Sequence, residues 1–264
     1  NYLNAILEAV GKNIRDGDFV VVSEKALSTA IGNVLDEARF EPGFSARIIA
    51  RYWMRWGWGY PLGISCRFGK RLLQRLRKYP IKSGSRHKQA ALQQGGLMQA
   101  LMFGSEAGID GSNLPYSLVS LPLPNAYAVA EKIRRHIRQQ LGKKVTVIIV
   151  DTDKTYTIRN FHFTPRPKPL KGINSRGSLA AYVIAKLFKL RKRPTPLAVA
   201  GCTLSAEHAL VIANVADRAR GPGSGATVWD MAARFKVNAT GVSWEMLEAI
   251  KHKPIVLVRH AAYM

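Results

Sequence analysis

The chain has 264 residues, and 47% of them are apolar, which is enough for a folded core in one large or two small domains. Forty Lys and Arg against seventeen Asp and Glu give a formal net charge of +23, so an anionic partner is expected. No apolar run approaches the roughly 18 residues that span a bilayer, so an integral membrane protein is excluded and no membrane partner is expected. Two cysteines and no recognisable secretion signal favour a cytoplasmic protein.

The first part of the chain shows helical and strand patterns in turn. Apolar residues at helical spacing predict a helix within residues 3–14, and a turn at 15–18 leads to a predicted strand at 19–22. Two further helices and then a loop are expected at residues 47–56, 71–77 and 83–85.

The second part contains the clearest unit. Asn125 can cap a helix that has one apolar and one basic face and that stops at Gly142. Residues 145–150 then predict a buried strand, with Asp151 just past its carboxyl end. We expect a proline-rich loop at residues 161–171 and a helix at 179–190. A second helix, capped by Ser205, is expected at 206–216, and a closing strand at 255–258. The fold class is therefore mixed α and β.

The acidic residues are unevenly distributed. Residues 42–105 contain twelve Lys or Arg and no acid, and residues 154–206 contain eleven and again no acid. Between these basic segments lie Glu106, Asp110, Glu131, Asp151 and Asp153. Carboxylates in so basic a chain can be ligands of a metal ion, or they can be turn formers and surface acids, and composition alone leaves both interpretations open.

The common nucleotide-binding motifs are absent: neither a P-loop nor a Gly-x-Gly-x-x-Gly turn occurs. The glycine-rich residues 221–225 could present backbone N–H groups to a phosphate, although a linker is the favoured interpretation. The aromatic residues between 52 and 60 could stack on bases, although packing in a core or a subunit contact is favoured. The six histidines have no ligand spacing, so none is expected to be catalytic.

Three motifs in order carry a resemblance to a known family. Residues 107–113 read Ala-Gly-Ile-Asp-Gly-Ser-Asn, a Leu-Pro pair follows at 121–122, and Asp151-Thr152 ends an apolar strand after an amphipathic helix. Upstream, residues 16–25 contain Asp-Gly-Asp, a strand and Glu-Lys. Together these segments resemble the gamma-glutamyl ligases of deazaflavin coenzyme F(420), and the resemblance extends over most of residues 16–225.

The resemblance implies the fold of those ligases, a homodimer, and a site for GTP. It implies that GTP activates a substrate carboxylate as an acyl phosphate, which the amine of L-glutamate attacks to form an amide. By this resemblance Asp110 and Asp151 would be ligands of Mg²⁺ or Mn²⁺ and Thr152 a ligand of a second ion, with K⁺ as a further candidate. Glu24, Lys25 and Asn113 would contact the nucleotide. The substrates would be L-glutamate and an anionic deazaflavin-type or related acid.

The chain also departs from that family. A lysine expected after Ser28 is replaced within Thr29-Ala30-Ile31, and Asp153-Lys154-Thr155 stands where the family has Gly-Arg, which changes the nucleotide and substrate sides. Only Asp217 remains near a later metal position. Residues 1–225 are expected to form the ligase-like domain, with a helix and strand of 226–264 packed on it. The alternative hypothesis is a decayed paralogue that binds nucleic acid or a ribonucleoprotein through residues 67–88 and 186–193.

Overall fold

The computed structural model describes residues 1–104, 106–221, 223–225 and 227–259, and it confirms a mixed α and β protein. Its helices are α1 Tyr2–Val10, α2 Glu24–Ala30, η1 Glu37–Arg39, α3 Phe44–Ile48, η2 Ile49–Trp58, α4 Pro61–Ser65, α5 Lys70–Arg77, α6 Ile81–Ala100, α7 Ala126–Leu141, α8 Ser178–Leu187, α9 Ala206–Arg220, α10 Val228–Phe235 and α11 Trp244–Glu248. Its strands are β1 Phe19–Ser23, β2 Val34–Asp36, β3 Leu118–Ser120, β4 Thr146–Ile158, β5 Phe161–Phe163, β6 Arg191–Ala200 and β7 Ile255–Val258.

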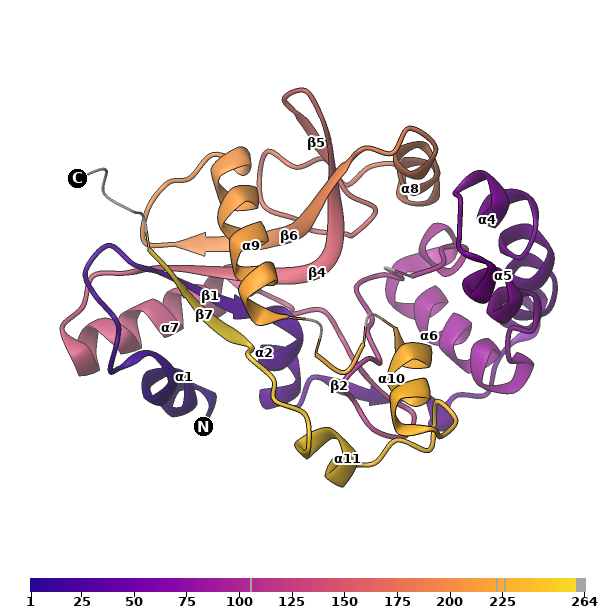
Figure 1. The fold of residues 1–264 in the computed structure, drawn as a ribbon, viewed down its shortest axis with the longest axis horizontal. Helices are drawn as coiled ribbons and strands as arrows, with labels where there is room; N and C mark the ends of the chain where they lie inside the picture. Colours follow the sequence, from indigo (N-terminus) through magenta and orange to yellow (C-terminus); the bar gives the residue numbers. More distant parts are fainter. Residues whose placement is uncertain (105, 222, 226, 260–264) are drawn as a thin grey trace.

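A mixed sheet forms the centre of one half of the molecule (Figure 1). Strand β1 lies between β4, to which it is parallel, and β7, to which it is antiparallel. Strand β4 also pairs with β5 and β6, both antiparallel. A separate ribbon of β2 and β3 lies beside the sheet, and a layer of helices from α3 to α6 forms the other half (Figure 1).

Alternating side chains of the central strands fill two cores on opposite faces of the sheet. Val20 and Val22 of β1 pack with apolar residues of α1 and α7, whereas Val21 packs with Ala216 of α9. This period of two is the pattern expected for a strand that is covered on both faces. The sheet is therefore sandwiched between α1 and α7 on one side and α9 on the other.

Helix α7 forms as its sequence predicts. The Asn125 side chain accepts a hydrogen bond from the Ala128 amide at 3.0 Å, and Ile133 and Ile137 are fully buried. Gly142 ends the helix in the left-handed conformation with φ of 67°, which glycine adopts without a Cβ clash. The predicted helices are also present: residues 47–56 belong to α3 and η2, and residues 71–77 belong to α5.

The loop predicted at residues 83–85 is wrong, because these residues belong to helix α6. A Cβ on Gly84 would lie 2.2 Å from Cε1 of Tyr79, and Ser85 is buried. The small residues therefore serve close packing of the helix against the Tyr79 ring and do not mark a turn.

The strand predicted at residues 145–150 continues well beyond its expected end. Strand β4 runs to Ile158, with irregular pairing between Asp151 and Lys154, because β6 and β5 provide partners after β1 has ended. Residues 161–163, expected in a loop, form β5. Strand β6 was not predicted, since its sequence begins Arg-Lys-Arg-Pro-Thr-Pro.

The C-terminal part of the described chain returns to the sheet. Helices α10 and α11 lie beside the β2 and β3 ribbon, and β7 then pairs with β1 along residues 19–22 (Figure 1). Strand β7 lies at residues 255–258, where a closing strand was predicted. That residues 1–225 form one ligase-like domain on which residues 226–264 pack stays a prediction.

No helix within the described ranges combines the length and the apolar character needed to cross a membrane.

Candidate active site

Two acidic residues from distant parts of the sequence meet where the parallel strands β1 and β4 stop pairing. Ser23 is the last residue of β1 and lies in register with Val150 of β4. Glu24 follows Ser23 as the first residue of α2, and Asp151 follows Val150. Carboxyl ends of neighbouring parallel strands are a common place for ligand sites, because the following residues converge at one edge of the sheet.

Arg166 joins these two acids. Its Nη2 donates to Glu24 at 2.6 Å to Oε1 and 2.5 Å to Oε2, and its Nε donates to Oδ2 of Asp151. Only 3% of the Arg166 side chain and 5% of the Glu24 side chain are exposed. A Cβ on Gly108, whose φ is 77°, would lie 3.2 Å from Arg166 Nη2, so glycine permits the close approach of the 107–113 segment.

The network holds more negative charge than one guanidinium neutralises. Burial, reinforced by the charge of Asp151, raises the pKa of Glu24 to about 7 even though Arg166 opposes this rise. Burial opposes the charge of Arg166 as well, but the two carboxylates outweigh it and raise the pKa of the guanidinium. Near pH 7, Glu24 is therefore close to its midpoint of ionisation, whereas Arg166 stays charged.

A second ion pair lies next along the chain. The Lys25 ammonium contacts the Asp110 carboxylate and donates to the Ser112 backbone oxygen at 3.0 Å and to its hydroxyl at 2.5 Å. Asp110 is fixed by backbone hydrogen bonds with Ser120 of β3, at 3.2 and 2.9 Å. Burial opposes its ionisation, but Lys25 and Ser112 prevail and lower the pKa of Asp110.

Asn113 connects this segment to the glycine-rich residues 221–225. Its Oδ1 accepts hydrogen bonds from the Ser224 amide at 3.2 Å and from the Ser224 hydroxyl. Pro222, which belongs to the segment whose backbone N–H groups could bind a phosphate, lies outside the described residues. The described part of this segment is packed against a residue that was expected to contact nucleotide.

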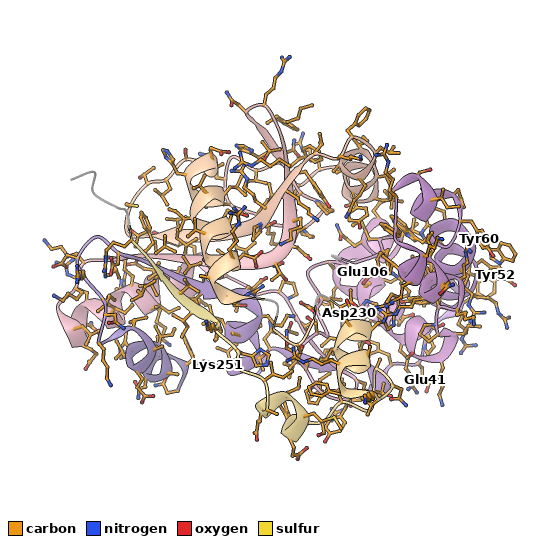
Figure 2. The ribbon with its side chains drawn as sticks, in the orientation of Figure 1. Glu41, Tyr52, Tyr60, Glu106, Asp230 and Lys251 are labelled. Atoms are coloured by element: carbon orange, nitrogen blue, oxygen red, sulfur yellow. The ribbon has the colours of Figure 1, made fainter. Side chains whose placement is uncertain are left out.

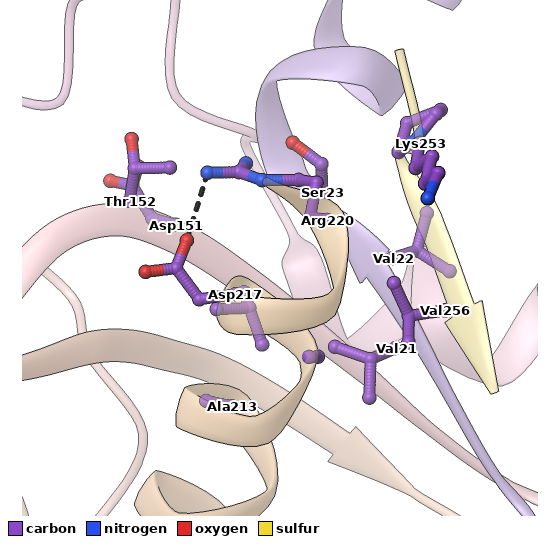
Figure 3. Close-up of a pocket in the computed structure, with 13 residues that line it drawn as sticks. Val21, Val22, Ser23, Asp151, Thr152, Ala213, Asp217, Arg220, Lys253 and Val256 are labelled. Atoms are coloured by element: carbon purple, nitrogen blue, oxygen red, sulfur yellow. Dashed lines mark hydrogen bonds and ion pairs between the residues drawn. The ribbon is translucent and has the colours of Figure 1, made fainter. Parts of the chain in front are cut away.

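A small depression, with a volume of about 20 Å³, adjoins Asp151. It is lined by Asp151 and Thr152 of β4, by the end of α9 and by residues before β7 (Figure 3). Asp217 accepts hydrogen bonds from Arg220 at 2.9 Å, the dashed line of Figure 3, and from Lys154 at 3.2 Å. The depression thus combines carboxylate and hydroxyl oxygens with a guanidinium, and Lys253 adds an ammonium.

The residues fit a divalent ion that is held jointly by protein and phosphate. Hard oxygen donors such as Asp110, Asp151 and Thr152 suit Mg²⁺ or Mn²⁺. Within the described ranges, no three of His, Cys, Asp and Glu gather as a metal cage. Magnesium sites with one or two carboxylates, completed by water and phosphate oxygens, need no such cage. Such an ion would compete with Lys25 and Arg166 for the two carboxylates.

Two other acids that the sequence offered as metal ligands have different partners. Glu106 pairs with the buried Lys88 and with His87, whose Nε2 lies 2.5 Å from Oε2. Burial opposes the ionisation of Glu106, but Lys88 and His87 lower its pKa to about 2. Glu131 contacts two arginines one helical turn away on α7. Glu131 is thus an acid of a helix surface, whereas Glu106 is buried in an ion-pair cluster, which is neither the metal ligand nor the surface acid that the sequence suggested.

The structure brings most of the predicted site residues to one region. Glu24 and Asp151 share Arg166, Lys25 contacts Asp110, and Thr152 lines the depression. Sequence reasoning missed Arg166, because it lies in the proline-rich segment that was interpreted only as a loop. Its one signal is a single arginine among three prolines, which does not identify a partner.

Comparison with known families identifies the family of the chain. A family model described as F420-0:Gamma-glutamyl ligase matches residues 1–174. The chain belongs to this family. The match contains all the motifs that carried the resemblance, and it ends before residues 175–225, to which the resemblance had been extended.

Two relatives illustrate where the chain stands among the gamma-glutamyl ligases. An uncharacterized protein of Methanocaldococcus jannaschii is 34% identical over 273 residues, which cover 98% of this chain and 91% of that protein. The coenzyme F420:L-glutamate ligase of Archaeoglobus fulgidus is 29% identical over 157 residues, 56% of this chain. The matched part is 53% of the length of that ligase.

Proposed function

We propose that the protein is a GTP-dependent ligase that joins L-glutamate to a carboxylate of a deazaflavin-type or related anionic acid. Membership of the gamma-glutamyl ligase family supports the reaction class. The observation that carries the proposal is the pair of linked ion pairs, Glu24–Arg166–Asp151 and Lys25–Asp110, at the end of the parallel strands. This arrangement gathers oxygen donors and cations from three distant parts of the sequence.

The proposed reaction has two steps. The substrate carboxylate attacks the γ-phosphorus of GTP, so that an acyl phosphate forms and GDP leaves. The glutamate nitrogen then attacks the acyl carbon, the C–O bond to phosphate breaks, and the nitrogen loses a proton. Phosphoryl transfer depends chiefly on positioning and charge neutralisation, which this site can supply.

The protein residues divide into ion ligands and phosphate contacts. Asp110 and Asp151, with Thr152 for a second ion, would hold Mg²⁺ or Mn²⁺, which neutralises phosphate oxygens when bound. Lys25 pairs with the Asp110 carboxylate and would contact phosphate once an ion replaces it there. Arg166 is a positioning residue that holds Glu24 and Asp151 in place.

Further nucleotide contacts come from outside the two ion pairs. Arg220 and Lys253 line the depression and would contact the phosphate tail. Glu24 and Asn113 remain nucleotide contacts in this proposal. A homodimer is part of the proposal too, and light scattering that gives twice 29.2 kDa would support it.

The nucleic-acid alternative receives less support from the positions of its basic residues. Arg75 pairs with Asp230, Lys88 is buried against Glu106, and Arg193 is 1% exposed. A nucleic-acid surface needs a continuous exposed track, and these inward contacts interrupt it in both segments.

Titration calorimetry with GTP and Mn²⁺ tests the proposal. Asp110→Asn and Asp151→Asn should each abolish metal-dependent binding, because each removes one charged ligand. Glu131→Gln is the matched control, since Glu131 also pairs with basic side chains but lies on α7. The product assay is mass spectrometry for an acid heavier by one glutamyl residue. Equal heats for Asp110→Asn and the parent would refute the metal assignment.

A further inference from the structure

A row of exposed apolar side chains follows the helical segment formed by α3 and η2 and continues into α4, a separate helix that begins after the non-helical Tyr60. Every fourth residue from 44 to 64 is apolar and exposed, and within α3 and η2 this spacing keeps the side chains on one face. We call this row the aromatic stripe: Phe44 80%, Ile48 40%, Tyr52 53%, Trp56 63%, Tyr60 40% and Ile64 56% exposed. Figure 2 shows Tyr52 and Tyr60 at the outer edge of the helical layer.

The opposite face of the same segment supplies the core contact. Ala46, Ala50, Met54 and Trp58 are fully buried, again at a spacing of four. The indole of Trp58 donates to the Leu101 backbone oxygen at 2.8 Å, which anchors the segment to the chain after α6. Because this buried face makes the contacts with the core, packing within the chain does not explain why the exposed face is apolar as well. Contiguous exposed apolar surface of this kind marks an interaction site.

The charge beside the stripe selects an anionic partner. Arg47 and Arg51 are exposed and directly precede Ile48 and Tyr52, and residues 42–105 contain no acid. A symmetric contact with a second copy would place the same patch against itself and bring like charges together. A partner that has both anionic groups and apolar parts would pair with the arginines and bury the apolar side chains.

The arrangement of the rings favours lipid over nucleic acid. Trp56 and Tyr60 stack with centroids 5.4 Å apart, and the Arg77 guanidinium lies 4.3 Å from the centre of the Tyr60 ring. The faces of Tyr60 are thus already in contact within the protein, whereas a base needs an open ring face. Ile48 and Ile64 have no face for stacking but suit acyl chains. Tryptophan, tyrosine and arginine beside aliphatic residues are typical of helices that lie in the membrane interface.

We propose that the aromatic stripe docks the protein on the surface of an anionic lipid bilayer, with its apolar side chains among the acyl chains and its arginines at the headgroups. This binding is peripheral and needs no spanning segment. It differs from the sequence-based expectation of no membrane partner, which considered apolar runs and not an exposed helical face. It is independent of the ligase chemistry proposed above, because it uses residues of a different layer.

Sedimentation with lipid vesicles tests the proposal on the full chain. The protein should bind vesicles of equal parts phosphatidylcholine and phosphatidylglycerol, and bind those of phosphatidylcholine alone much less. Phe44→Ser and Trp56→Ser should each weaken the partition coefficient about tenfold, because each removes a large side chain from the interface. Phe188→Ser is the matched control, since Phe188 is 72% exposed but lies outside the stripe.

Circular dichroism of each variant separates loss of binding from loss of fold, and the exposure of Phe44 and Trp56 predicts unchanged spectra. Absence of binding to the anionic vesicles would overturn the proposal. So would equal losses for the Phe188 control. Binding of a single-stranded RNA oligonucleotide that Trp56→Ser removes, without vesicle binding, would assign the stripe to nucleic acid. A dimer that Phe44→Ser dissociates would assign it to a second copy.

Discussion

Replacing Glu24 with Gln should make the stability of the protein less dependent on pH between about pH 5 and 8. Glu24 is buried beside Asp151, and its pKa rises from 4.5 to about 7. In the unfolded chain this carboxyl loses its proton near its ordinary pKa, whereas the folded protein keeps the proton up to about pH 7. Between these values the folded state binds more protons, so the free energy of unfolding falls as pH rises.

The magnitude follows from the two pKa values. One pH unit corresponds to about 1.4 kcal/mol, so a rise from 4.5 to about 7 costs the folded protein about 3 kcal/mol above pH 7 relative to pH 4. Glutamine has the shape of the protonated acid and does not titrate. The parent should therefore lose about 3 kcal/mol more stability than Glu24→Gln across this range.

Urea unfolding followed by circular dichroism at several pH values measures this difference. Glu131→Gln is the control, because Arg134 and Arg135 lower the pKa of Glu131 to about 2 and its contribution therefore changes only under acidic conditions. Identical pH dependence of Glu24→Gln and the parent above pH 5 would refute the reasoning. If the site holds a divalent ion, saturating Mn²⁺ should displace the proton and flatten the pH dependence of the parent as well.

Three stability changes test other contacts, each by urea unfolding. Lys88→Met should destabilise by about 3 kcal/mol, because the buried Glu106 carboxylate loses one of its two cationic partners and keeps only His87, and adding Glu106→Gln should restore part of this loss. Asn125→Ala should cost about 1 kcal/mol by removing the α7 cap. Ile133→Ala should cost about 2–5 kcal/mol because the side chain is fully buried, so a value near that of the cap would contradict the packing described for α7.

Elements whose determinants are local were predictable from the sequence. Helix α7 has its cap, its apolar face and its terminating glycine within one stretch of sequence, and β1 is a short apolar run bounded by a turn. The positions of two predicted site residues were also visible in the local sequence, because Glu24 and Asp151 each follow an apolar run that forms a strand. Parallel pairing of those strands then places the two acids together.

Features that depend on distant partners were not predictable in the same way. Strand β6 contains Pro194 and Pro196. Among the described strands it pairs with β4 alone, so it is an edge strand, where prolines are tolerated. Gly84 resembled a turn residue, yet the ring of Tyr79 gives it a packing role. Asp151 pairs with Arg166, and nothing in the sequence around either residue specifies this pair.

The charge balance of the candidate active site links its ion pairs to nucleotide binding. Glu24, Asp110 and Asp151 contribute three carboxylates, whereas Lys25 and Arg166 contribute two cations. Around these two linked ion pairs a polyphosphate would therefore meet a net negative charge when Glu24 is ionised, although Arg220 and Lys253 line the adjoining depression and the whole chain carries +23. A divalent ion reverses the sign of this balance and lowers the cost of keeping Glu24 charged. The proposed ligase should thus bind nucleotide and metal together, whereas its excess positive charge lies largely elsewhere, including the layer that carries the aromatic stripe.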